Sequence, residues 1–365
     1  MLPQPAWKWL AGIGLCFGLV LFVAGGAMFY PTTGAKSPTA YRLDIYPVRR
    51  IEAELVYHQK CPNLQAREWI VFVARPPELP SQSDVKLSVE PRGQPMVESS
   101  PLQRDLLLLR LPGDGARWQQ FEVKVQVQAR LHARRLLPRE PRQPITPAVV
   151  LPVLERQRFL TAHGLCDHSS REFQRWLDAR KLRRSPGESD VDFARRAFLA
   201  VTQNWKYDYR SGQERQASKL VTEQATDCGG MSLVFTAALR ANGIPARVLA
   251  GRWAESSRPG ELAGGVPFHQ THVKAEFFAD GIGWVPVDPS SAVLHDRTKD
   301  GLRYFGNDPG DFLTLHLDTD LQVETVHFGP KTLPWLQGVA YWVTGAGNAD
   351  RCVTSEKWEV RKLAP

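Results

Sequence analysis

Short runs of alternating apolar and polar residues fill the chain from about residue 41 to residue 150. The clearest run lies at 121–131, where apolar residues occupy every second position from Phe121 to Val127. Similar runs occupy 49–57, 68–74, 85–90 and 106–111, and clusters of Pro and Gly separate them. Period-two runs at this spacing predict an antiparallel β-sandwich domain over residues 41–150. We expect it to serve a structural or binding role.

Helical spacing replaces the alternation in the next part of the chain. Apolar residues recur every three or four positions at 171–180 and at 189–205. A third predicted helix, at 231–242, is apolar nearly all round, which is typical of a buried central helix. It ends in Asn-Gly-Ile-Pro, with Gly243 suited to a left-handed cap and a proline beyond.

Two β-branched and aromatic runs follow the central helix. They surround His272 and precede Asp288, and an Ala-Asp-Gly turn signal separates them, so they predict a β-hairpin. The fold class is therefore α+β, with a core over 160–295 in which the central helix packs on an antiparallel sheet. Residues 296–365 alternate in parts and are expected to form a β-rich extension of that core.

Residues 10–30 form an almost uncharged apolar run flanked by tryptophan and tyrosine. About 20 apolar residues suffice to span a bilayer. The run predicts a transmembrane anchor over 1–32, and a cleaved signal peptide with small residues at 24–27 is the alternative. The length of the run favours a single-pass anchor. We expect the rest of the chain to be extracytoplasmic, because long domains translocate largely regardless of nearby charge.

Cys228 stands at the start of the predicted central helix, directly after Asp227, a good N-cap residue. The free N–H groups and the positive dipole end at a helix N-terminus favour the thiolate, which is the nucleophilic form. A lone cysteine is also commonly a small buried core residue. His272 and Asp288 favour the reactive interpretation, because thiol acyl transfer uses an imidazole to move the proton and a carboxylate to orient the imidazole.

The motifs Cys-Gly, Gly-Ile-Pro-Ala-Arg, His-x-x-x-Glu and Gly-Trp-Val-Pro-Val-Asp-Pro occur in this order within residues 185–295. This pattern resembles the transglutaminase-like superfamily, in particular its bacterial members. The resemblance implies a papain-like core with Cys228 as nucleophile, His272 as base and Asp288 as the orienting acid. His269 is a weaker candidate base, because it lacks the glutamate four residues later and the family's interval to Asp288.

The resemblance also implies acyl transfer on a peptide or protein substrate through a thioester. Water as acceptor makes the protein a peptidase or amidase, and an amine makes it a cross-linking enzyme. Lys274 departs from the family, which usually has an aromatic residue two positions after the histidine. We expect its ammonium either to point along the substrate groove, where it would repel an amine and favour hydrolysis, or to face solvent on an edge strand. A non-catalytic module that binds or scaffolds at a membrane, and a zinc site built from the same three residues, stay open.

Composition adds little to this picture. The formal net charge of +8 is moderately basic, but no nucleic-acid-binding signature accompanies it, so nucleic acid is not an expected partner. His163, Cys166 and His168 match no common zinc spacing, and we expect no metal and no cofactor. Cys61 and Cys352 are too isolated in sequence to predict a disulfide framework.

Overall fold

The computed structural model describes residues 40–140, 149–210, 212–258, 262–263, 266–267 and 270–363. The predicted anchor at 1–32 and the rival base His269 lie outside these residues. Within the described part of the chain, no helix combines the length and the apolar character needed to cross a membrane.

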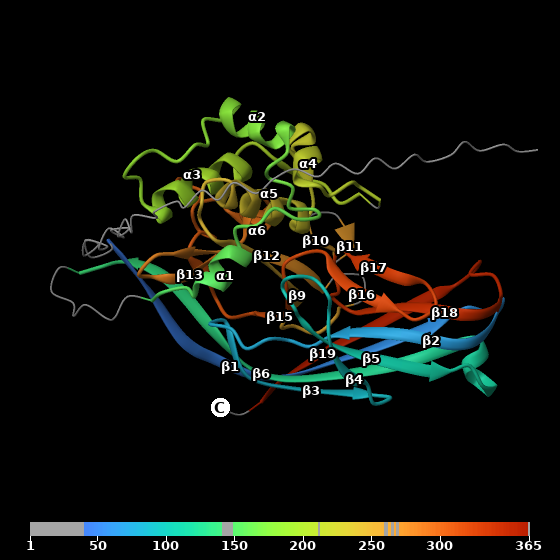
Figure 1. Cartoon of the computed structure of the whole chain (residues 1–365). Coiled ribbons are helices and arrows are strands. Elements are labelled where there is room, and N and C mark those ends of the chain that lie inside the picture. Colours follow the sequence, from blue (N-terminus) through green and yellow to red (C-terminus); the bar gives the residue numbers. More distant parts are fainter. Residues whose placement is uncertain are drawn as a thin grey trace, which may run out of the picture. The chain divides into compact units, whose positions relative to one another are not determined.

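Two antiparallel sheets share one apolar core and make up the lower part of Figure 1. Their elements are β1 (Tyr41–Lys60), β2 (Leu64–Ala74), β3 (Gln82–Glu90), β4 (Gln94–Val97), β5 (Asp105–Pro112), η1 (Gly115–Trp118), β6 (Gln120–Pro138), β14 (Asn307–Asp308), β18 (Val339–Gly347) and β19 (Val353–Leu363). The strand orders are β14-β6-β1-β19, with β3 also paired to β6, and β18-β2-β5-β4. The alternation predicted at 121–131 is confirmed in β6, where Phe121 and Val127 are buried between exposed polar residues. Trp69 of β2 meets Phe121 across the core at 5.0 Å between ring centroids.

The last two strands of the chain complete this sandwich. β19 pairs with β1 along its whole length, and β18 pairs with β2. A disulfide joins Cys61, next to β1, to Cys352, next to β19. The cysteine spacing did not predict this bond, because a separation of 291 residues is closed only by the β1–β19 pairing. Of the residues expected to extend the core, β18 and β19 lie in the sandwich instead.

The remaining elements include a four-stranded sheet that helices cover, above the sandwich in Figure 1, and three separate two-stranded sheets. They are α1 (Val153–Arg158), α2 (Arg171–Ala179), α3 (Asp190–Thr202), β7 (Lys206–Tyr207), α4 (Ala217–Glu223), β8 (Ala225–Thr226), α5 (Cys228–Arg240), β9 (Ala246–Trp253), β10 (Leu262–Ala263), β11 (Val266–Pro267), β12 (Thr271–Ala279), β13 (Gly283–Val287), α6 (Pro289–His295), β15 (Phe312–Leu317), β16 (Leu321–Thr325) and β17 (Gly329–Leu333). The sheet order is β13-β12-β9-β15. Every residue of α5 after Cys228 is buried, which confirms the predicted central helix. The Ser232 hydroxyl donates to the Val273 carbonyl on β12 at 3.1 Å.

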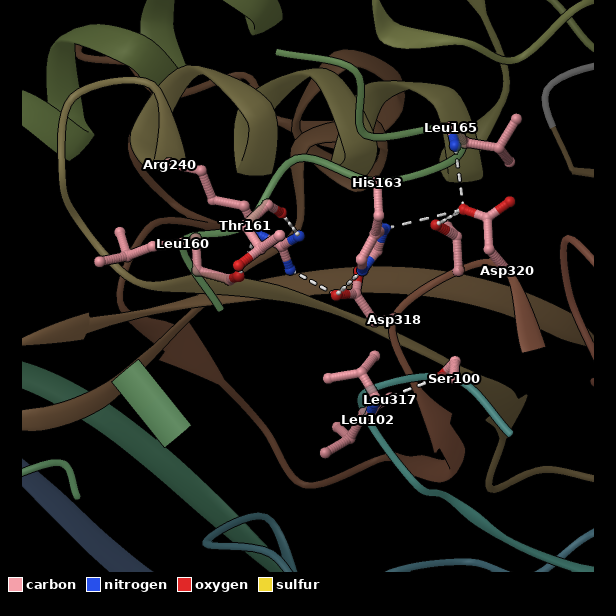
Figure 2. Close-up of polar contacts among 12 residues, drawn as sticks. Ser100, Leu102, Leu160, Thr161, His163, Leu165, Arg240, Leu317, Asp318 and Asp320 are labelled. Atoms are coloured by element: carbon pink, nitrogen blue, oxygen red, sulfur yellow. Dashed lines mark hydrogen bonds and ion pairs between the residues drawn. The ribbon is translucent and has the colours of Figure 1, made fainter. Parts of the chain in front are cut away.

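A buried ion pair holds the C-terminal end of α5 (Figure 2). The Arg240 guanidinium pairs with the Asp318 carboxylate just after β15, and it also donates to the Ala246 carbonyl at 2.9 Å. Gly243 has φ +75°, as the predicted helix stop requires. Removing one partner of a buried pair costs about 3–5 kcal/mol. This contact therefore fixes the position of the helix whose other end carries Cys228.

A second buried ion network joins the sandwich to the sheet that α5 covers. Arg134 on β6 pairs with Glu276 on β12 at 2.5 Å and with Asp308 on β14 at 2.9 Å. Glu276 also pairs with Arg247 on β9 at 2.6 Å. Because buried charges are tolerated only when they are paired, these contacts fix the register between the two parts of the fold.

Candidate active site

Cys228 is the first residue of α5 and is half-buried. The helix starts here because Asp227 adopts extended backbone and its carboxylate accepts from the Gly230 N–H at 3.0 Å. Arg215 pairs with Asp227 at 2.5 Å, so the positive guanidinium offsets the negative charge of the cap. The thiol therefore lies at the positive end of a fully capped helix.

The first turn of α5 approaches its neighbours closely. A Cβ at position 230 would come within 2.2 Å of the Thr226 hydroxyl, so only glycine fits there. At Gly229 the nearest neighbour is the half-buried ring of Trp335, 3.1 Å from a Cβ placed at that position. Trp335 thus lies against the backbone next to the Cys228 thiol, although more than 100 residues separate the two in sequence.

The structure brings His272 and Asp288 together. His272 lies on β12 and Asp288 follows β13, and the His272 Nε2 atom lies 2.8 Å from the Asp288 Oδ2 atom. Both side chains are buried. Because Nε2 faces the carboxylate, Nδ1 is the ring nitrogen left to interact with the thiol. Burial alone would lower the pKa of His272, but the Asp288 carboxylate and the neighbouring Cys228 raise it to about 9.

Hydrogen bonds from the first turn of α6 hold the Asp288 carboxylate. The carboxylate caps α6 by accepting from the Ser291 N–H at 2.9 Å, and it also accepts from the Ser291 hydroxyl at 2.8 Å and the Ser290 hydroxyl at 3.1 Å. Burial would raise the pKa of Asp288, but the charge and the hydrogen bond of His272 hold it well below its usual range. The carboxylate is therefore ionised and fixed in orientation.

Aromatic side chains surround the thiol and the imidazole. Trp253 stacks on His272 with ring centroids 4.3 Å apart and an interplanar angle of 22°. Phe312 meets the same imidazole edge-on at 5.9 Å. The Tyr207 hydroxyl lies next to Cys228, and burial together with this neighbour raises the pKa of the phenol. These contacts restrict the imidazole to one orientation.

Two supporting residues could not be found from the sequence. The Gln337 side-chain amide donates to the His272 carbonyl at 2.7 Å and to the Gly251 carbonyl at 2.9 Å, so it ties β12 to β9 at the site. Trp253 ends β9 and has no sequence motif that marks it.

Lys274 does not face solvent on an edge strand, so that expectation is wrong, and two carboxylates hold its ammonium. Only 5% of its surface is exposed. Its ammonium lies 3.2 Å from Asp311 and 3.4 Å from Asp308. The residue lies on β12 between β9 and β13, which makes this a central strand of the sheet rather than an edge strand. The argument for hydrolysis that rested on Lys274 therefore no longer applies.

The three residues considered as a metal pattern have separate partners. His163 faces Asp318 and Asp320, Cys166 is fully buried, and the His168 ring lies 3.0 Å from the Leu160 carbonyl. Across the described residues, no group of three or more His, Cys, Asp or Glu side chains is arranged to hold a metal ion.

The chain is similar to known proteins over one sequence segment and in its fold. The family model described as "Transglutaminase-like superfamily" matches residues 179–289. A solved structure of a "Putative Cysteine Protease" from Cytophaga hutchinsonii has a TM-score of 0.53 and 13% identity, covering 89% of this chain and 93% of that chain. The periplasmic domain of TgpA from Pseudomonas aeruginosa has a TM-score of 0.32 and 17% identity, covering 69% of this chain and 92% of that chain. The comparison with curated protein sequences gave no match.

A thiol at the first turn of a buried helix, next to an imidazole–carboxylate pair on an antiparallel sheet, defines a protein with a cysteine-protease-like core. The family match over 179–289 covers all three side chains. Residues 179–289 therefore form a transglutaminase-like domain. The similarity over 89% of the chain shows that the shared fold extends beyond that segment.

Proposed function

We propose that this protein is a thiol-dependent enzyme that transfers the acyl group of a peptide or amide, with Cys228, His272 and Asp288 as its catalytic residues. The observation that carries the proposal is the buried His272–Asp288 contact of 2.8 Å beside a thiol at a helix N-terminus. Charged, paired and oriented groups of this kind are what nucleophilic catalysis by cysteine requires.

In the first step, the Cys228 thiolate attacks the carbonyl carbon of the substrate amide. The Cys228 backbone N–H at the start of α5 stabilises the developing oxyanion. His272, held as the imidazolium by Asp288, donates its proton to the leaving amine. The C–N bond breaks, the amine departs, and a thioester to Cys228 remains.

In the second step, the neutral His272 accepts a proton from the acyl acceptor, which attacks the thioester. Collapse of this intermediate releases the carbonyl product and regenerates the thiolate–imidazolium pair. Water needs no binding site of its own, whereas an amine needs a second channel to the thioester. Hydrolysis is therefore the simplest reaction that this arrangement supports, and we propose it over cross-linking.

We also propose that the enzyme is anchored in a membrane by residues 1–32 and faces an extracytoplasmic compartment. The apolar run at 10–30 supports an anchor. The disulfide between Cys61 and Cys352 supports an oxidising compartment, because such bonds are rare where thiols are kept reduced. Protease treatment of intact cells and of lysed cells tests the orientation. Degradation in both samples, once any outer membrane has been removed, would support this orientation, whereas protection in intact cells with degradation in lysed cells would contradict it.

The activity is tested by incubating the full-length protein in detergent with a peptide library, with and without a fluorescent primary amine. We expect cleaved peptides, and hydrolysed product in excess of amine conjugate. Cys228→Ala must abolish turnover, whereas Cys166→Ala, the matched change at the other described free cysteine, must not. Conjugate in excess at millimolar amine would indicate cross-linking. Peptide binding without turnover would indicate the non-catalytic module.

A further inference from the structure

The face of β12 that carries His272 also carries a buried cation. His272, Lys274 and Glu276 alternate along the strand with Val273, Ala275 and Phe277, which pack in the core that α5 shares. The side chain two positions from the proposed catalytic base is therefore inside the protein. Burying an unpaired ammonium costs free energy, so a buried Lys274 needs oppositely charged partners.

Lys274 shares its neighbours with His272. Its ammonium lies 4.8 Å from the centroid of the Trp253 ring and 5.0 Å from that of Phe312. The same two rings contact the His272 imidazole at 4.3 Å and 5.9 Å. These rings hold the cation beside the imidazole.

Lys274 is also close to Asp288. A small cavity of about 30 Å³ lies beside both side chains, and its polar lining includes Lys274, Asp288, Tyr304, Asp308 and Asp311. In such a poorly solvated environment a unit charge acts strongly over several ångströms. The lysine charge is one of the causes that keep the pKa of Asp288 low, after burial, which opposes them, and after His272.

We propose that Lys274 is a positioning residue, whose fixed positive charge between Asp308 and Asp311 sets the charge balance of the His272–Asp288 pair. The proposal rests on the proposed function. Without Lys274, the site would hold an excess of negative charge next to the imidazole. With Lys274, and with Arg134 beside Asp308, the two carboxylates are neutralised, so Asp288 is the carboxylate that controls the proton on His272.

Other charged and titratable groups face the same pair and must be counted. Asp308 is also paired with Arg134, so its charge is shared between two cations. Asp311 is the more exposed partner, with 30% of its side chain accessible. Cys228 is a further titratable neighbour of the imidazole, and Tyr207 lies next to Cys228. Of these groups, Asp311 is the one that can be neutralised without breaking the Arg134 network.

The test measures the protonation of His272 in two ways, by its NMR signal and by the pH dependence of turnover. Full-length protein with ¹³C-labelled histidine is titrated by NMR, with His272→Gln identifying the signal, and kcat/KM is measured against pH in parallel. Lys274→Met removes the cation, so the imidazolium is stabilised and both the NMR midpoint and the alkaline limb of the profile rise by about one pH unit. Asp311→Asn removes an opposing anion and moves both downward. Lys274→Arg keeps the charge and stays close to the wild type.

If Lys274 had a purely structural role, Lys274→Met would lower the melting temperature and leave the NMR midpoint and the alkaline limb of the pH profile unmoved. Unmoved midpoints in Lys274→Met and Asp311→Asn therefore overturn the proposal. If Lys274→Met does not fold, the direction of the Asp311→Asn change decides. If the midpoints of the variants move as expected but the wild-type protein shows no turnover, the role of Lys274 is supported and the proposed enzymatic activity is refuted. The two failures are thus distinguishable.

Discussion

Asp288→Asn tests how much of the proposed reaction depends on one charge. The asparagine is nearly the same size, but only one of its two terminal atoms accepts hydrogen bonds. Asp288 uses Oδ1 for Ser290 and the Ser291 N–H, and Oδ2 for His272 and the Ser291 hydroxyl. If the amide nitrogen faces His272, the imidazole must change tautomer. If it faces Ser291, the cap of α6 is lost.

The expected magnitude follows from the proton affinity of His272. Its pKa is raised from 6.5 to about 9 despite burial, with Asp288 as the leading cause of the rise. Returning the pKa to its ordinary value would destabilise the thiolate–imidazolium pair by roughly 3 kcal/mol. The equilibrium constant for forming the pair would then fall about 10²-fold. The wrong tautomer adds to this, and in serine-enzyme triads the equivalent change lowers kcat by about 10⁴. We therefore expect kcat to fall between about 10²-fold and 10⁴-fold.

The assay compares kcat and KM of the wild type, Asp288→Asn and the exposed control Asp300→Asn on a cleaved peptide. Circular dichroism and melting temperature establish that each variant is folded. We expect a loss in kcat with little change in KM, because Asp288 acts through the imidazole rather than on bound substrate. Near-full activity of a folded Asp288→Asn protein would refute the assignment of Asp288.

Three further outcomes follow from features described above. Cys228 should react with iodoacetamide near neutral pH faster than Cys166, because Cys166 is buried and its pKa is raised to about 12. The reverse order of labelling, measured by mass spectrometry, would exclude Cys228 as the nucleophile. Asp318 has a pKa held below its usual range, against burial, by Arg240 and His163, so the stability it contributes is present above about pH 4 and is lost as the pH falls below that. Melting temperatures between pH 2 and 7 should therefore fall less steeply for Asp318→Asn than for the wild type, and equal slopes would contradict this. Replacing Cys61 and Cys352 together by serine should lower the unfolding free energy by about 2–5 kcal/mol, and an unchanged urea midpoint would show that the bond adds no stability.

The local features of this protein were predictable from sequence because local rules determine them. The apolar run of α5, its Gly243 stop and the cap at Asp227 follow from helix chemistry, and the alternation of β6 follows from strand geometry. The order of the four motifs was sufficient to predict that His272 lies near Asp288.

The supporting contacts were not predictable, because they join distant segments. Gln337 reaches the His272 carbonyl from 65 residues away, and Cys61 meets its disulfide partner across 291 residues. Alternation places Lys274 on the same face as His272, but it does not say what covers that face. A buried carboxylate, a half-buried carboxylate and two aromatic rings cover it, and three of these four residues come from the segment after position 296.

The pairing of β1 with β19 sets an order of events during synthesis. One edge of β1 finds its partner as soon as β6 is made, but the other edge stays open until residue 363, which is 225 residues after residue 138. At about 5–20 residues per second, that interval lasts roughly 10–45 s. An open strand edge is a template for unwanted pairing with other chains. A nascent chain that stalls before position 353 therefore keeps one edge of β1 unpaired and prone to aggregation, so that it needs a chaperone or is degraded.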